Sequence, residues 1–224
     1  MNDLVPAAWI LAGYLLGSVS FAYLVVRARA GVDLRTIGSG NLGATNVGRA
    51  LGRKWALIVY ALDFLKGFAL PAALRACEDR ATWDGGPPLA ASVGLAAFLG
   101  HCYPLWHGFR GGKGVATASG LIVALAPWAG LATLGLFGAT LAAFRMISLG
   151  SVVAAVALPF LYVAVVGRAE ALGAGGRWIL GLFALIAAWV TVRHRGNLAR
   201  IAAGTEPKIG TRRSAGPRDG VSQG

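Results

Sequence analysis

Long segments without charged side chains fill most of this chain and restrict what it can fold into. The longest covers residues 115–144, and another runs over 22 residues from Val5 to Val26. A helix that crosses a bilayer needs about 20 apolar residues, whereas a soluble domain of 224 residues needs no such segments. Because 56% of the residues are hydrophobic as well, we predict an all-α, polytopic integral membrane protein.

Residues 115–144 decide how many helices cross the membrane. They would form about 45 Å of helix, too long for one span and too short for two ordinary spans. Pro127 lies near the middle, where a turn would divide the segment into two short helices. The other predicted spans are Val5 to Val26, Trp55 to about Leu74, about Leu89 to Leu105, Ile147 to Val166 and Trp178 to Val192.

The basic residues favour the divided segment. With two helices in residues 115–144, the basic stretches 27–54, 100–117 and 193–218 all lie on one side, as the positive-inside rule requires. We therefore predict seven transmembrane helices, with the N-terminus outside and the C-terminus inside. The start of the chain lacks the basic region of a cleaved signal, so the first span is expected to be retained. Residues 1–210 form one membrane domain, and 211–224 a flexible cytoplasmic tail.

The net charge of +12 is explained by these short loops and does not indicate nucleic-acid binding. Cys77 and Cys102 fall near opposite ends of neighbouring spans, so no disulfide is expected. Nothing in the sequence predicts a metal site, a cofactor or an obligate protein partner. Asp63 and Lys66 lie three residues apart inside the second span, on one helical face, and should pair or face a polar cavity.

A polar stretch in the middle of the chain, GHCYPLWHGFRGGKGVAT at residues 100–117, is here termed the second motif. Three glycines bracket Lys113, and backbone N–H groups among glycines together with a lysine are suited to phosphate. The stretch is not a Walker A motif, because His107 stands at its first glycine and Gly114 replaces its Ser or Thr. The alternative is that Lys113 is only a positive-inside charge and that His101 and His107 are structural.

Two further motifs share this chemistry. The first motif, GSGNLGATNVGR at residues 38–49, contains GxGxxG but no βαβ unit, so it does not indicate a dinucleotide site. It offers hydroxyls, amides and Arg49, although it could be only a flexible turn. The third motif, HRGNLARIAAGTE at residues 194–206, places His194, Asn197 and Arg200 on one helical face, unless it is a solvated basic tail. Glu206 is expected to pair with a neighbouring arginine.

Together the three motifs resemble the bacterial acyl-phosphate-dependent glycerol-3-phosphate acyltransferases of the PlsY family, over nearly the whole chain to about residue 210. Residues 63–67 (DFLKG) and 145–151 (RMISLGS) are also similar to that family. Leu42 stands where the family often has proline, and Arg110 where lysine is common. The resemblance implies a multi-pass enzyme of the bacterial inner membrane with its active site facing the cytoplasm. Its reaction would convert acyl phosphate and glycerol 3-phosphate to lysophosphatidate and phosphate, in phospholipid biosynthesis.

No HxxxxD or GxSxG motif supplies a catalytic dyad or nucleophile, so we expect direct attack of the acceptor hydroxyl on the acyl carbonyl. The predicted catalytic residues are Ser39, Arg49, Lys113, His194 and Asn197. The general base is either His194 or the phosphate of the donor. Residues predicted to bind substrate or phosphate are Gly40, Asn41, Thr45, Asn46, Lys66, His101, Gly111, Gly112, Gly114, Thr117, Ser148 and Arg200, with Asp63 and Glu206 as structural residues.

The alternative function is a membrane transporter of a phosphorylated solute, which Asp63 and Lys66 inside a span would suit. Against it, the three motifs fall on one side of the membrane and no inverted repeat is evident. A basic membrane scaffold would leave the three glycine-rich motifs unexplained.

Overall fold

The computed structural model describes residues 4–78 and 86–210, and every regular element within these ranges is a helix, as predicted. The predicted tail at 211–224 lies outside the described residues. The α-helices are α1 Leu4–Ser18, α2 Phe21–Ala30, α3 Ala44–Leu51, α4 Arg53–Glu78, α5 Gly86–Cys102, α6 Val115–Leu125, α7 Pro127–Phe144, α8 Ile147–Val166, α9 Arg168–Leu172, α10 Gly176–Arg193 and α11 Arg195–Ala202; short 3-10 helices are η1 Leu34–Thr36 and η2 Leu105–His107.

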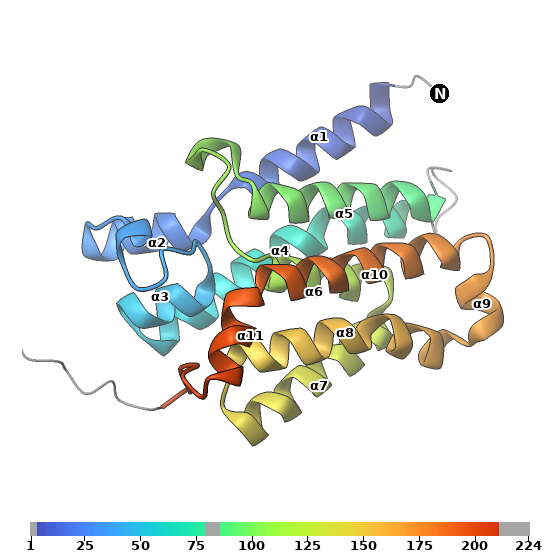
Figure 1. The fold of residues 1–224 in the computed structure, drawn as a ribbon. Coiled ribbons are helices and arrows are strands. Elements are labelled where there is room, and N and C mark those ends of the chain that lie inside the picture. The colour runs from blue at the N-terminus through green and yellow to red at the C-terminus, as the bar shows by residue number, and fades with distance from the viewer. Residues whose placement is uncertain (1–3, 79–85, 211–224) are drawn as a thin grey trace, which may run out of the picture.

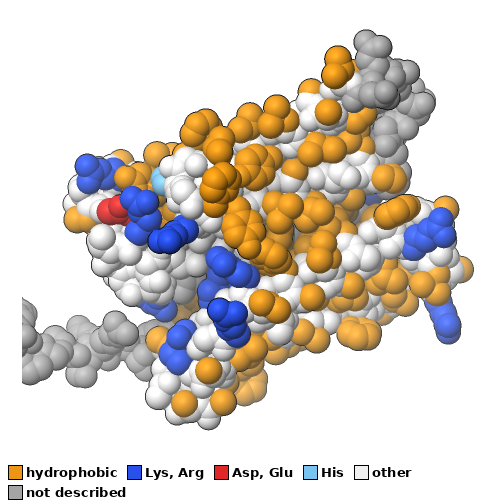
Figure 2. Space-filling view, turned by 45° about the horizontal axis from the view of Figure 1, so that its top comes forward, with side chains coloured by type: hydrophobic (Ala, Val, Ile, Leu, Met, Phe, Trp, Pro, Cys, Tyr) orange, Lys and Arg blue, Asp and Glu red, His pale blue; other side chains and the backbone are white. Residues whose placement is uncertain are grey.

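The long helices form an elongated bundle, and the short helices lie at its ends (Figure 1). α2, α3 and α11 gather at one end, whereas α9 lies at the other. Hydrophobic side chains cover the length of the bundle, and Lys and Arg side chains appear towards its ends (Figure 2). This distribution is that of a protein surrounded by lipid, with an apolar belt between two polar ends.

Within the described residues, six helical segments are long and apolar enough to cross a membrane, and α6 is a shorter apolar helix. The six are α1 with α2, α4, α5 with η2, α7, α8 and α10. α8 has the bounds predicted for the sixth span, and α10 is three residues longer than the 15-residue span predicted there.

The first predicted span, Val5 to Val26, is not one continuous helix. α1 ends at Ser18 and α2 begins at Phe21, with Ser20 as its N-cap. The Ser20 hydroxyl accepts the N–H of Tyr23 at 3.3 Å, which competes with continuation of the α1 hydrogen-bond ladder. Residues 4–30 still count as one candidate span, as predicted, but a capping serine breaks the helix inside the apolar run, a feature that the sequence did not predict.

Residues 115–144 form two helices, as predicted from Pro127. α6 ends at Leu125 and α7 begins with Pro127 at its first position, where the missing N–H is harmless. A Cβ on Gly130 would lie 2.7 Å from the Val123 side chain. Residues seven apart in one helix are about 10 Å apart along its axis, so the chain must reverse direction here.

Glycines bring two helix pairs into direct backbone contact. Between α1 and α5, a Cβ on Gly17 would lie 2.1 Å from the Ala97 carbonyl oxygen. Between α4 and α6, a Cβ on Gly67 would lie 2.0 Å from the Thr117 carbonyl oxygen, and one on Gly120 equally close to that of Phe64. Small residues at such crossings are typical of membrane helix packing, and these two crossings fix α5 and α6 on either side of the second motif.

Candidate active site

Lys113 links the second motif to the third. Its ammonium donates a hydrogen bond to Oδ1 of Asn197, on the first turns of α11. The Asn197 amide in turn donates through Nδ2 to Oε1 of Glu206 at 2.6 Å. The predicted catalytic residues Lys113 and Asn197 are therefore in contact, although 84 residues separate them in the chain.

The Lys113 ammonium lies in a strongly cationic environment. Burial lowers its pKa to about 8; the Glu206 charge opposes the shift, and the charges of Arg200, Arg193 and Arg49 add to it. Four cations that repel one another around one point form a site that an anion would stabilise. The three arginines come from three different helices: Arg49 from α3, Arg193 from the end of α10 and Arg200 from α11.

Glu206 holds the third motif in shape. Its carboxylate accepts hydrogen bonds from Ser148 Oγ at 2.6 Å and from Arg200 Nε at 2.8 Å, in addition to Asn197. Burial raises the pKa of this carboxyl, but the three hydrogen bonds outweigh burial and hold its pKa below the usual range. The predicted pairing of Glu206 with a neighbouring arginine is confirmed. Ser148, predicted to bind substrate or phosphate, is buried and donates to Glu206 instead.

The segment after α11 is fastened to the α7–α8 turn. The N–H of Ile209 donates to the Arg145 carbonyl at 2.7 Å, and the Arg145 guanidinium donates back to the Ile209 carbonyl at 2.6 Å. Arg145 has a φ of 60°, a left-handed conformation that non-glycine residues rarely adopt. This clasp keeps Glu206 against α8.

His194 lies between α10 and α11 and is only 4% exposed. Its Nδ1 is 2.7 Å from the Val190 carbonyl oxygen, which can only accept, so Nδ1 carries the proton. Burial and the nearby Lys113 charge lower the pKa of His194 to about 4, so the imidazole is neutral near pH 7. A neutral ring protonated at Nδ1 has its lone pair on Nε2, which can accept a hydrogen bond from a hydroxyl.

The backbone N–H groups of Gly111 and Gly112 are not free, and these glycines serve instead to let the second motif pack closely against its neighbours. The N–H of Gly111 donates to the Cys102 carbonyl and that of Gly112 to the His101 carbonyl, both at 3.1 Å. The prediction that these two amides grip phosphate is therefore contradicted, because the loop folds back on the end of α5. A Cβ on Gly112 would lie 1.9 Å from Nε2 of His101, and Gly114 has a φ of +85° with the Phe98 ring against it.

Asn46 shapes the first motif, and although it was predicted to bind substrate or phosphate, it is buried and bonded to the loop itself. The buried Asn46 amide accepts from the Ser39 N–H at 3.2 Å and donates to the Ile37 carbonyl at 2.9 Å. Asn46 therefore closes the loop upon itself. Gly40, at φ +66°, packs against the Arg35 carbonyl, and Asn41 is partly buried, whereas Ser39, Thr45 and Arg49 are exposed.

Three predicted substrate contacts lie beneath the site instead of in it. Lys66 is 3% exposed and His101 7%. Thr117, on α6, is fully enclosed where α6 packs against α4. Lys66 Nζ lies 2.8 Å from Oδ1 of Asp63, so the predicted ion pair within α4 is confirmed. The structure thus gives Lys66 and His101 protein partners, where the sequence analysis expected substrate.

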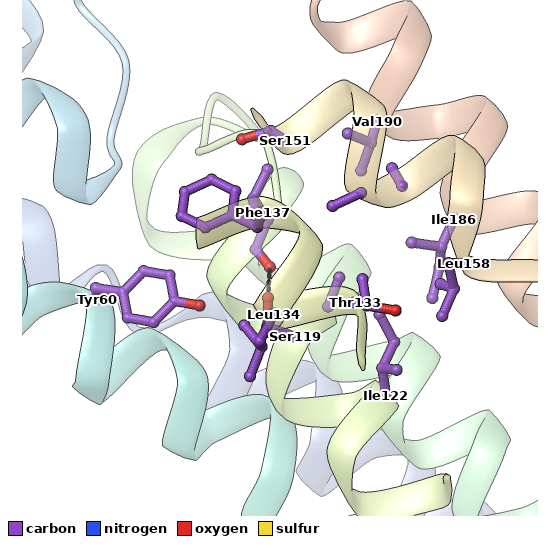
Figure 3. A pocket seen from close by; sticks show the side chains of 14 residues that line it. Tyr60, Ser119, Ile122, Thr133, Leu134, Phe137, Ser151, Leu158, Ile186 and Val190 are labelled. Atoms are coloured by element: carbon purple, nitrogen blue, oxygen red, sulfur yellow. Dashed lines mark hydrogen bonds between the residues drawn. The ribbon is translucent and has the colours of Figure 1, made fainter. Parts of the chain in front are cut away.

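An apolar pocket lies among the helices of the bundle. It is lined by residues from α4, α6, α7, α8 and α10, among them Tyr60, Ser119, Phe137 and Val190 (Figure 3). Val115, which also lines it, directly follows Gly114, and the Val190 carbonyl is the one that contacts His194. Two residues of the pocket lining are therefore close to the site, Val115 along the chain from Lys113 and Val190 through its contact with His194.

Arg193 is a site residue that sequence reasoning missed. The guanidinium donates from Nη2 to the Gly112 carbonyl at 3.1 Å, which ties the end of α10 to the second motif. In the sequence, Arg193 is only the first residue of the basic stretch 193–218. Its position directly before His194 was the available signal. No group of three His, Cys, Asp or Glu side chains in residues 4–78 and 86–210 is arranged to hold a metal ion.

The chain matches the family model described as glycerol-3-phosphate acyltransferase over residues 7–204. It is 44% identical over 209 residues to the glycerol-3-phosphate acyltransferase of Parasynechococcus marenigrum (strain WH8102), covering 92% of both chains. The Myxococcus xanthus (strain DK1622) protein of the same name is 45% identical, with 92% of this chain and all of the relative covered.

A solved structure is similar across nearly the same range. The crystal structure of PlsY (YgiH), an integral membrane glycerol 3-phosphate acyltransferase, superposes in its glycerol 3-phosphate form with a TM-score of 0.79. The identity is 37%, and the match covers 92% of this chain and 96% of the other. A lysophosphatidic acid form of that protein gives a TM-score of 0.77 at 36% identity.

Proposed function

The chain belongs to the glycerol-3-phosphate acyltransferase family, integral membrane enzymes of phospholipid biosynthesis, and we propose that its acyl donor is acyl phosphate. The reaction transfers the acyl group to a hydroxyl of glycerol 3-phosphate and yields lysophosphatidate and phosphate. One observation carries this proposal: the cationic cluster around Lys113 adjoins the apolar pocket. A donor with a phosphate head and an acyl tail matches both surfaces at once.

The step needs no covalent enzyme intermediate. The acceptor oxygen attacks the acyl carbonyl carbon, a new C–O bond forms, and the bond from that carbon to the phosphate oxygen breaks. Phosphate leaves from a mixed anhydride and is already a good leaving group. Lys113 and Arg193 stabilise its growing charge in a partly dry site, so charge stabilisation and positioning supply most of the rate.

His194 orients the attacking hydroxyl. The lone pair on Nε2 accepts a hydrogen bond from this hydroxyl, while the Nδ1–H bond to the Val190 carbonyl fixes the ring. A pKa of about 4 makes His194 a poor resting place for the proton near pH 7. The proton therefore passes to an oxygen of the departing phosphate, and Asn197 keeps Lys113 directed at that phosphate.

The acceptor binds at the first motif. Ser39, Thr45 and Arg49 are exposed, and the Arg49 charge acts on Lys113. In this proposal the three side chains hold the phosphate of glycerol 3-phosphate. Gly40, Asn41 and Asn46 set the shape of this loop. Arg200 has its guanidinium half exposed beside Glu206 and contributes a further positive charge.

We count α6 as a seventh span, with the N-terminus outside and the C-terminus in the cytoplasm of a bacterial cell. Its 11 residues rise about 16 Å, against about 27 Å for the 18 residues of α7. We propose that the start of α6, and with it the active site, lies below the cytoplasmic membrane surface, which accommodates this difference in length. A reporter cysteine at Trp128, in a chain lacking Cys77 and Cys102, tests this: labelling from the periplasm is expected, and labelling only from the cytoplasm contradicts it.

Donor choice is the experiment that tests the function. Purified protein in detergent is given glycerol 3-phosphate with either palmitoyl phosphate or palmitoyl-CoA, and lysophosphatidate is followed. Product from palmitoyl phosphate alone is the expected result. Product only from palmitoyl-CoA would contradict the proposed donor. Absence of product from both, in folded protein, would instead favour transport of a phosphorylated solute and call for solute-flux measurements.

A further inference from the structure

The break between α1 and α2 leaves a carbonyl inside the bundle that α2 does not satisfy. In a continuous helix the Val19 carbonyl would accept the N–H of Tyr23, but that N–H donates to the Ser20 hydroxyl. Lys66 of α4 supplies the missing donor, with Nζ 2.9 Å from the Val19 oxygen. An unsatisfied carbonyl at membrane depth costs several kcal/mol, so this contact stabilises the break.

The direction of α2 after the break determines where the first motif lies. Ala22 and Val26 of α2 are buried in a small core with Leu34, Leu42 and Val47. These last three residues flank or belong to the first motif. A change in the bend between α1 and α2, visible in Figure 1, would therefore carry Ser39 and Arg49 with it.

Lys66 is connected to the second motif through Asp63 and His101. Asp63 Oδ1 is 2.8 Å from Lys66 Nζ and 3.6 Å from Nδ1 of His101, and all three side chains are almost fully enclosed. The His101 carbonyl accepts the Gly112 N–H, and its ring occupies the space where a side chain at position 112 would be. The loop that presents Lys113 thus rests directly on His101.

We propose that Asp63, Lys66 and His101 form a positioning cluster that sets the separation between the first motif and the second. In this proposal they act through the two loops, since their side chains are almost fully enclosed and contact protein groups. The cluster fixes the first motif through the Val19 carbonyl and α2. It fixes the second motif through the His101 ring and carbonyl, which contact Gly112. The inference deepens the proposed function, since it concerns two loops that would each hold one phosphate of the reaction.

The double substitution Asp63→Asn with Lys66→Met tests this proposal, because it removes both charges together and leaves no lone ion in the membrane. Lys66→Met alone would strand the Asp63 carboxylate and could prevent folding. Arg75→Met is the matched control, since Arg75 also lies on α4 and donates to a carbonyl, that of Leu125, at the far end of the bundle. Thermal unfolding in detergent checks that each variant is folded.

Two readouts are compared. The first is kcat and KM for both substrates, where the double variant is expected to lose about 10- to 100-fold in kcat, as misplacement by about 1 Å can produce. If Asp63 and Lys66 only balanced each other's buried charge, the double variant would keep wild-type activity. The second is the distance between nitroxide labels at Val32 and Trp106, both exposed and outside the site, measured by double electron–electron resonance. A shifted or broader distribution is expected in the double variant and not in Arg75→Met.

An unchanged distance distribution overturns the proposal, whatever happens to the rate. A changed distribution with unchanged kcat overturns it as well, because loop separation would then not matter to the reaction. The distance measurement requires no turnover. A failure of the proposed donor chemistry therefore remains distinguishable from a failure of the positioning cluster.

Discussion

Helix α4 carries two cations that perform the same task at two different helix breaks. Lys66 donates to the Val19 carbonyl at the break between α1 and α2, and Arg75 donates at 2.6 Å to the Leu125 carbonyl at the break between α6 and α7. Nine residues separate them, or about 13 Å along the helix. In both places a helix ends inside a membrane protein and a charged donor satisfies a leftover carbonyl.

The surroundings of the two cations differ. The Lys66 side chain is 1% exposed, paired with Asp63, and connected through His101 to the loop of Lys113. Arg75 is only partly buried, near the end of α4. The same contact is therefore purely architectural at one end and coupled to chemistry at the other. Substitutions at the Lys113 end should lower activity more than stability, and those at the Arg75 end the reverse.

The largest difference in kcat is expected between alanine substitutions of two glycines, one beside Lys113 and one on α7. Gly112→Ala places a methyl group 1.9 Å from Nε2 of His101, so the second motif must move away from α5 and Lys113 with it. We expect kcat to fall by about 100-fold in folded protein. Gly135→Ala on α7, where nothing lies within 4 Å of the added Cβ, is the matched control and should keep full activity. Equal losses of kcat in both variants would contradict the conclusion that the packing of Gly112 on His101 positions Lys113.

A smaller difference in kcat/KM is expected between glutamine substitutions of two glutamates, Glu206 in the site and Glu170 on α9. Glu206→Gln removes the charge that pairs with Arg200 but keeps an amide oxygen that can accept from Ser148. Loss of a charged hydrogen-bond network of this kind is expected to lower kcat/KM about 10-fold. Glu170→Gln, on exposed α9 at the other end, should change kcat/KM by less than two-fold. Activity of Glu206→Gln at the wild-type level would show that the network is dispensable.

The pH profile distinguishes Lys113 from the arginines around it. Since burial lowers the pKa of Lys113 to about 8, the ammonium is charged below pH 8 and loses its proton above it. We expect kcat/KM to fall about 10-fold between pH 7 and pH 9. In Lys113→Arg, which stays charged, this alkaline decrease should disappear even if the absolute rate is lower. The same decrease in both proteins would assign it to another group.

The smallest effect on activity is expected for Arg75→Met. The variant loses one charged hydrogen bond, which contributes about 1.5–3 kcal/mol, so thermal unfolding should occur at a lower temperature. Activity should remain within two-fold of wild type because the site lies at the other end of α4. A large loss of kcat with unchanged unfolding temperature would show that Arg75, like Lys66, is coupled to the reaction.

The sequence predicted the features that depend on composition and local spacing. The bounds of α8, the division at Pro127 and the Asp63–Lys66 pair follow from apolar length, proline geometry and helical periodicity, and all are observed. The break at Ser20 was missed, because no proline or charge interrupts that apolar run and a single capping serine gives a weak signal.

Within the candidate site, the contact between the second and third motifs could be expected from the sequence, whereas the internal arrangement could not. That Lys113 meets Asn197 follows the expectation that the motifs converge. The commitment of the Gly111 and Gly112 amides to the end of α5, and the burial of Lys66 and His101, could not be predicted, since both depend on how α4, α5 and the loop pack in three dimensions. Sequence spacing identifies which groups are polar, whereas packing decides which of them face substrate.

The central claim is that Lys113 is the cation on which the transfer from acyl phosphate depends. The most direct test is kcat for wild type and Lys113→Ala with palmitoyl phosphate and glycerol 3-phosphate, in protein shown to be folded. Removal of one charge-stabilising donor typically lowers kcat by about 10²–10³, and we predict a loss of at least this size. A kcat within a few-fold of wild type would contradict the account.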